Sequence, residues 1–195
     1  MRAGAGARRA RSATVPDSMG IPRALVLLAL VAAAARGPAI RDLAIATDGV
    51  QIRVSFEFAG GFDQEVVERI ASGLPTSFVY DLELLRDRKR WWDDSLERSR
   101  IEVVAMYNAV TGEYLVNTKQ DGRLLESRTV RDRSELEGAM TRFRALPVFT
   151  VEEPDPQERY LVRARGELEP GEVLGFIPVR RTTSWVESNK VRIRG

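Results

Sequence analysis

The sequence of 195 residues contains neither cysteine nor histidine. The lack of cysteine excludes disulfides, thiol nucleophiles and lipid attachment through an N-terminal cysteine. The lack of histidine excludes Ser-His-Asp triads, and the lack of both excludes the usual Cys/His zinc sites. Because 44% of the residues are hydrophobic, one core of ordinary size can form, and we expect packing alone to stabilise the fold.

Sequence motifs of several enzyme classes are missing as well. The chain has no glycine-rich phosphate loop, no Gly-x-Ser-x-Gly elbow and no Ser-x-x-Lys arrangement. Only Lys89, Lys119 and Lys190 could serve as a lysine base. The acidic stretch at 152–158 lacks the alternating Asp/Asn and Gly spacing of a calcium loop. We therefore predict no serine hydrolase, no cofactor and no metal site.

Basic residues are concentrated at the front of the chain. Residues 1–39 contain six arginines and a single acidic residue, Asp17, so that 24 basic and 27 acidic residues remain from Ile40 onward. The pI of about 9.2 thus reflects the N-terminal segment, and the domain that follows carries a net charge of about −3. Because nucleic-acid binders need a positive surface for the phosphate backbone, we predict no nucleic-acid partner.

An apolar run lies inside this basic segment. Residues 24–35 read ALVLLALVAAAA and are flanked by Arg23 and Arg36, a pattern typical of a secretory signal peptide. As a helix the run spans about 18 Å, short of the ~30 Å hydrocarbon core of a membrane. We predict a signal segment at 1–39 that is cleaved after Ala35 or Ala39, with a retained anchor as the alternative. Within it we expect Met19 to be the true initiator, so that residues 1–18 are an over-long start. A single β-rich domain at 40–195 would then lie in the periplasm or cell envelope.

Alternating hydrophobic residues predict strands along most of this domain. Residues 50–58 alternate with a period of two, and the preceding Asp48-Gly49 is a hairpin signal that predicts a partner strand at 41–47. The same period returns at 78–84 and 101–110. Further strands are predicted at 114–116, 123–129 and 160–168, and one or two more up to residue 193.

Two segments have a helical period instead. Asp63 is predicted to cap a short amphipathic helix that ends before Gly73. Ser134 and Glu137 have the spacing of a capping box and predict a second helix of about ten residues that Pro147 ends. Eight to ten strands and two short helices predict a mainly β fold, an antiparallel β-sandwich or curved sheet, of which an immunoglobulin-like arrangement is one form.

Several segments, in this order, resemble a bacterial family of exported or envelope proteins, domain of unknown function 4390. The resemblance rests on the opening strands with Asp48-Gly49, on IASGLP at 70–75 and FVYDLEL at 78–84, on RWW at 90–92, on YNAVTGEY at 107–114 and on WVES at 185–188. It implies an exported or envelope protein. It transfers no activity and no catalytic residues.

The most distinctive local feature is a basic cluster that runs into two tryptophans between predicted strands. The candidate binding residues are Arg86, Arg88, Lys89, Arg90, Trp91 and Trp92. Arginine and tryptophan are enriched at binding hot spots, which favours contact with an envelope protein or another envelope component. The same residues could rest at a lipid headgroup layer as a peripheral membrane contact. A third interpretation is packing, with one indole in the core and the other under an arginine stem.

Carboxylate chemistry is the enzymatic alternative that the composition leaves open. A glycosidase needs two carboxyl groups roughly 5–9 Å apart, one with a raised pKa. Asp81 and Glu83 lie two residues apart on one strand face, hence about 6–7 Å apart. Because they alternate with hydrophobic residues, a solvated strand face is the simpler interpretation. We therefore expect a non-catalytic exported domain that binds an envelope partner, with a carboxylate-based hydrolase or a lipid-surface module as alternatives.

Overall fold

Two antiparallel sheets form the domain, and the computed structural model describes residues 37–87, 94–168 and 181–193 of it. These residues belong to one compact unit, Arg36–Gly195. Residues 1–36 of the predicted signal segment lie outside the described residues, and its last residue, Ala39, is the first residue of a strand. Among the described helices, none is long and apolar enough to cross a membrane.

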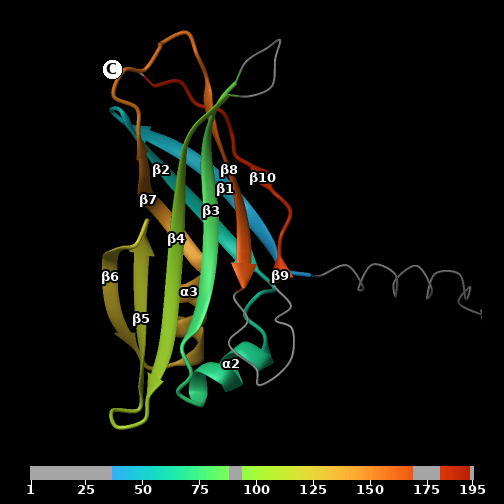
Figure 1. Ribbon diagram of the computed structural model, residues 1–195, viewed down its shortest axis with the longest axis vertical. Helices are drawn as coiled ribbons and strands as arrows, with labels where there is room; N and C mark the ends of the chain where they lie inside the picture. The colour runs from blue at the N-terminus through green and yellow to red at the C-terminus, as the bar shows by residue number, and fades with distance from the viewer. Residues whose placement is uncertain (1–36, 88–93, 169–180, 194–195) are drawn as a thin grey trace, which may run out of the picture. The chain divides into compact units, whose positions relative to one another are not determined.

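The smaller sheet has three strands and the larger has seven (Figure 1). In order across the smaller sheet these are β1 (Ala39–Asp48), β2 (Gln51–Ala59) and β7 (Arg142–Thr150). The larger sheet runs β10 (Val186–Glu187), β8 (Tyr160–Leu168), β3 (Thr76–Arg86), β4 (Asp94–Asn108), β5 (Glu113–Gln120) and β6 (Arg123–Val130), and β9 (Arg181–Thr182) also pairs with β8. The prediction of a mainly β sandwich with two short helices is confirmed.

The core lies between the inner faces of the two sheets. On β2 the alternation predicted from the sequence buries Ile52, Val54, Phe56 and Phe58. Phe56 packs against Tyr80 of β3 with ring centroids 5.1 Å apart. The buried Tyr80 hydroxyl donates to the carbonyl oxygen of Met140 at 2.7 Å, which ties the larger sheet to the second helix.

The two sheets pack tightly where Gly166 of β8 meets the side chain of Phe58 from β2. A Cβ atom at Gly166 of β8 would lie 2.8 Å from the ring of Phe58, closer than carbon atoms pack. Glycine at this position therefore lets the sandwich close.

The first helix, α2 (Gln64–Ala71), forms as predicted. The side chain of Asp63 accepts a hydrogen bond from the backbone N–H of Val66 at 3.0 Å, and Val66 and Ile70 are buried. Gly73 follows the helix with φ +85°, the left-handed conformation that favours glycine.

The second helix, α3 (Arg133–Thr141), differs from the prediction at both ends. Its N-cap is Asp132, whose carboxylate accepts from the backbone N–H of Glu135, and Ser134 lies inside the first turn. The helix stops before Phe143, because that residue pairs with Phe56 of β2 in strand β7 and their rings stack at 4.6 Å. Pro147 lies within β7, and β2 is the only described strand that pairs with β7, so the missing N–H costs little.

The C-terminal segment covers the outer edge of β8. The backbone N–H of Thr183 donates to the carbonyl oxygen of Gly166 at 2.9 Å, and the side-chain hydroxyl of Thr183 accepts from the backbone N–H of Gly166 at 3.0 Å. Asn189 continues to the smaller sheet, where its side-chain amide pairs with both backbone groups of Ile45 in β1. This side of the sandwich is therefore closed by hydrogen bonds.

Candidate functional site

Two acidic side chains of β3 point to the outer face of the larger sheet. They alternate with Tyr80, Leu82 and Leu84, which are buried in the core, so the pleat turns Asp81 and Glu83 away from it. The exposed fraction of the side chain is 18% for Asp81 and only 3% for Glu83. The prediction of a solvated strand face is therefore wrong for Glu83.

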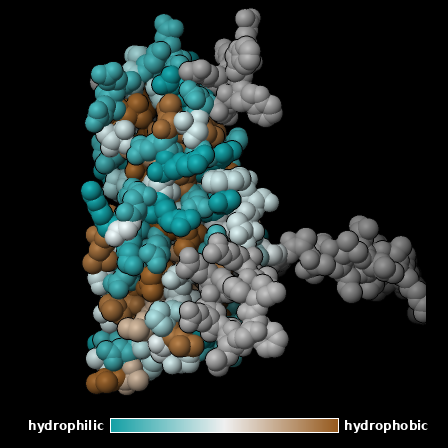
Figure 2. Space-filling view, viewed as in Figure 1, coloured by the Kyte–Doolittle hydropathy of each residue, from teal (hydrophilic) through white to brown (hydrophobic). Residues whose placement is uncertain are grey.

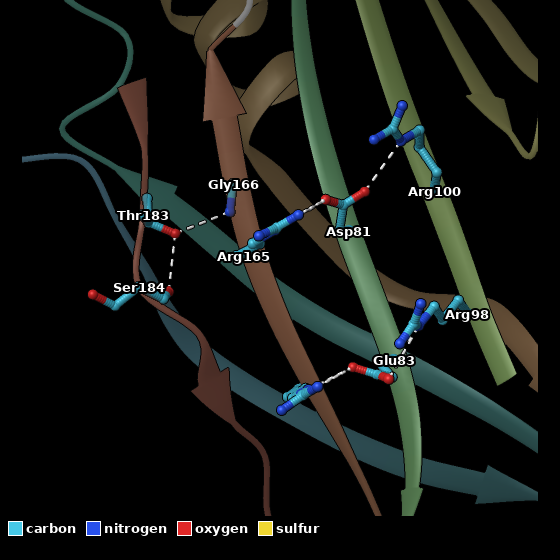
Figure 3. Close-up of polar contacts among 9 residues, drawn as sticks. Asp81, Glu83, Arg98, Arg100, Arg165, Gly166, Thr183 and Ser184 are labelled. Carbon is cyan, nitrogen blue, oxygen red and sulfur yellow. Dashed lines mark hydrogen bonds and ion pairs between the residues drawn. The ribbon is translucent and has the colours of Figure 1, made fainter. Parts of the chain in front are cut away.

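Arginines on both neighbouring strands cover these carboxylates. The register places Asp81 between Arg100 of β4 and Arg165 of β8. It places Glu83 between Arg98 of β4 and Arg163 of β8 in the same way. We call this set the arginine–carboxylate ladder; its members are Asp81, Glu83, Arg98, Arg100, Arg163 and Arg165 (Figure 3).

The contacts within the ladder are direct ion pairs. Asp81 accepts from Nε of Arg100 at 3.1 Å and from Nε and Nη2 of Arg165 at 3.0 and 2.9 Å. Glu83 accepts from Nε of Arg98 at 3.1 Å and from Nε of Arg163 at 2.6 Å. Each carboxylate is thus shared by two guanidinium groups, one on either side.

The ladder keeps Glu83 ionised. Burial by itself would raise the pKa of this carboxyl, but hydrogen bonds from Ser95, Arg163 and Arg98 and the positive charge of Arg163 outweigh burial and lower the pKa. A general acid needs a raised pKa, as in a glycosidase. The lowered pKa of Glu83 is the opposite of what that role requires.

Trp185 lies over the β8 side of the ladder. Its ring is 4.8 Å from the guanidinium carbon of Arg163 and 4.7 Å from that of Arg165, within cation–π range of both. The pairing of Thr183 with Gly166 holds the preceding backbone against β8. The indole is partly exposed.

The ladder lines a shallow cavity of about 430 Å³ together with Leu82, Ser99, Asp121 and Trp185. In Figure 2 a hydrophilic band crosses the middle of this face of the larger sheet. Asp121 accepts from the Ser99 hydroxyl and from the backbone N–H of Arg100. Four arginines against three carboxylates give the lining a net charge of +1. No group of three or more acidic residues able to hold a metal ion occurs among the described residues.

A family model described as Domain of unknown function (DUF4390) matches residues 35–173. The chain belongs to this family. The resemblance inferred from the sequence is thus confirmed, and all six ladder residues lie within the matched span, whereas Trp185 follows it. No curated protein and no solved structure matches the chain.

The binding cluster predicted for this DUF4390 chain can be located only in part. Arg88, Lys89, Arg90, Trp91 and Trp92 lie outside the described residues. Arg86 ends strand β3 and forms an ion pair with Glu158 of the acidic loop. The segment connects the two strands that carry Asp81, Glu83, Arg98 and Arg100, and its binding role stays a prediction.

Sequence reasoning missed the ladder itself. Its signal was present as a repeated spacing, Asp-x-Glu at 81–83 and Arg-x-Arg at 98–100 and 163–165. Such spacing puts each pair on one strand face. Only the pairing order β8-β3-β4 brings the three pairs together.

Proposed function

We propose that this DUF4390 chain is a non-catalytic, exported domain of the cell envelope. Its role would be to bind a protein or another envelope component through the outer face of the larger sheet. The observation that carries the proposal is the arginine–carboxylate ladder beside a partly exposed tryptophan, in a shallow cavity. Arginine and tryptophan are the side chains most enriched where binding energy is concentrated.

The state of the carboxylates supports binding over hydrolysis. Asp81 and Glu83 are the acidic pair that the sequence offered for catalysis, and both are held between arginines. A carboxylate in two ion pairs, with a lowered pKa in the case of Glu83, is suited to positioning guanidinium groups. With its pKa lowered, Glu83 is poorly suited to donating a proton at neutral pH.

The export part of the proposal is supported by the N-terminal sequence. The apolar run at 24–35, the arginines before it and the small residues after it have the anatomy of a signal peptide. N-terminal sequencing of the protein recovered from the periplasmic fraction should find a new terminus after Ala35 or Ala39. An intact terminus in the membrane fraction would contradict the cleaved form.

Site-specific photo-crosslinking in intact cells tests the binding role. A photoreactive residue at Leu96, on β4 next to the ladder, should crosslink to a discrete envelope component. The same residue at Val110, in the turn after β4, is the control because that position is 95% exposed. Equal crosslinking at both positions, or none at Leu96, would contradict the proposed binding face.

A further inference from the structure

The arginine side chains on the β4 side of the ladder have N–H groups that no acceptor of the described residues uses. The side chains of Arg98 and Arg100 are 78% and 60% exposed, against 35% and 37% for Arg163 and Arg165. Within the part of the chain that the structure describes, the side chains of Arg98 and Arg100 donate only through Nε. Their terminal amino groups are left to meet acceptors from outside.

Charge alternates from strand to strand across the ladder. Arginines of β8 are followed by the carboxylates of β3 and then by the arginines of β4 (Figure 3). Continued by one more strand, the pattern would place carboxylates beyond β4, opposite Arg98. Opposite charges on neighbouring strands stabilise their pairing.

The edge of β4 is open at this level. Pairing with β5 begins at Ile101, which lies opposite Gln120, and β3 is the only described strand paired with residues 94–100. Figure 1 shows β5 and β6 beside the lower half of β4 only. An edge strand that is left open offers backbone N–H and C=O groups to an incoming chain.

Asp121 already forms hydrogen bonds with the backbone of Arg100, the last residue of this open edge. Its backbone N–H donates to Arg100 O at 2.9 Å, and its carboxylate accepts from Arg100 N at 2.8 Å. An acidic residue outside β4 can therefore satisfy the backbone of the edge. Beyond Asp121, toward Leu96, no described residue continues this arrangement as a strand.

We propose that an extended, acidic segment of a partner protein binds here. It adds as a strand to β4 beside residues 95–98 and directs a carboxylate to the free amino groups of Arg98, because Asp121 holds the position directly opposite Arg100. That carboxylate is also the diagonal neighbour of Arg100, and a long side chain such as arginine can reach a diagonal neighbour on the next strand. Main-chain hydrogen bonds supply affinity in this mode of recognition, and the arginine–carboxylate pairs supply selectivity. The inference rests on the binding role proposed above and specifies the partner.

An anionic membrane fits the same features less well. Lipid headgroups cannot use the open backbone edge of β4. The ladder also holds the carboxylates of Asp81 and Glu83 between its arginines, and the domain from Ile40 onward carries about −3 net charge. Attraction to an anionic surface requires a continuous basic patch.

Binding of a short peptide of alternating glutamate and threonine to the purified protein, measured by titration calorimetry, tests the inference. The double variant Arg98→Gln/Arg100→Gln should raise the dissociation constant by about tenfold or more, because two charge-assisted hydrogen bonds are lost. Arg98→Lys/Arg100→Lys should fall between this variant and the wild type. Arg131→Gln is the matched control, since Arg131 makes a similar exposed ion pair with Glu113 away from the ladder. A peptide with glutamine in place of glutamate should not bind.

Hydrogen exchange separates strand addition from simple charge contact. Amide exchange within residues 95–98 should slow by about tenfold when the glutamate peptide is bound, and exchange within residues 101–108 should stay unchanged, because β5 already pairs there. Unchanged exchange at 95–98 would overturn the strand-addition geometry.

The outcomes also separate this inference from the function on which it rests. A crosslinked partner at Leu96 together with no glutamate-peptide binding would overturn the acidic-segment inference and leave the proposed function standing. If neither a crosslinked partner nor binding of the glutamate peptide is found, the proposed function and the acidic-segment inference are both contradicted. Arginine-dependent binding to phosphatidylglycerol vesicles, with none to the peptide, would overturn the inference in favour of a lipid surface.

Discussion

The two sides of the ladder contain the same chemistry in different surroundings. On the β8 side, both Nε and Nη2 of each arginine contact its carboxylate, and the ring of Trp185 covers both guanidinium groups. On the β4 side, the arginines donate through Nε alone and have no described aromatic cover. Covered ion pairs with good geometry hold strands together, whereas exposed pairs contribute little to stability. On the proposal made above, the β8 side stabilises the fold and the β4 side is the part that meets a ligand.

Glu83→Ala should give the largest effect on stability. The carboxylate is almost fully buried and is shared by Arg163 and Arg98. Its removal leaves the guanidinium group of Arg163 without its acceptor, a loss of about 3 kcal/mol in the free energy of unfolding. Urea denaturation measures it. Glu126→Ala, an exposed acidic residue of β6, is the control and should change the free energy by less than about 0.5 kcal/mol.

A loss for Glu83→Ala no larger than that of the control would show that the ladder does not stabilise the sheet. In that case the two sides would be equivalent, and the distinction between them would be wrong.

Trp185→Ala should have the next largest effect. It removes the aromatic cover from Arg163 and Arg165 and costs about 1–2 kcal/mol, the sum of two cation–π contacts in partly covered surroundings. Thermal denaturation should show a lower melting temperature, and Trp185→Phe should restore part of it. If Trp185→Ala melts like the wild type, the indole is a contact for a partner and not a cover for the β8 side.

The stability of the ladder should depend on pH through Glu83. Because the folded-state pKa of this carboxyl lies below its ordinary value of 4.5, its contribution is fully present above that value and is lost as the pH falls through the folded pKa. The free-energy difference between wild type and Glu83→Gln should therefore be constant near neutral pH and shrink below about pH 4.5. Urea denaturation between pH 7 and pH 3 measures it. A difference that grows on acidification would mean that the pKa is raised, and Glu83 would again be a candidate acid.

Local signals in the sequence predicted those parts of the fold that local chemistry decides. Gly49, in the turn that follows Asp48, and the alternation along β2 specify the first hairpin without help from the rest of the chain. Asp63 likewise specifies the start of α2. The end of α3 was missed because Phe143 gains a stacked partner on β2 by becoming a strand residue, and helical periodicity carries no information on that partner.

The ladder depends on pairing between distant parts of the chain. Glu83 and Arg163 are 80 positions apart, and their contact requires both the order of the strands and their register. The first half of β4 was missed for a related reason. Residues 94–100 read DSLERSR, with too few apolar residues for a recognisable alternation. This segment is a strand because it pairs with β3 and its arginines find the carboxylates there.

The smallest effect on stability is expected for Arg98→Gln/Arg100→Gln. Both side chains are exposed, and each carboxylate keeps its arginine on β8, so the free energy of unfolding should fall by less than about 1 kcal/mol. Arg163→Gln/Arg165→Gln is the matched variant on the β8 side. It should lower the free energy of unfolding by more than twice as much in the same urea titration, because these two arginines are half covered by Trp185 while they pair with the carboxylates. The β4 variant should instead lose crosslinking from Leu96. If the two variants lose equal stability, the β4 arginines are structural, and their spare amino groups are not kept for a ligand.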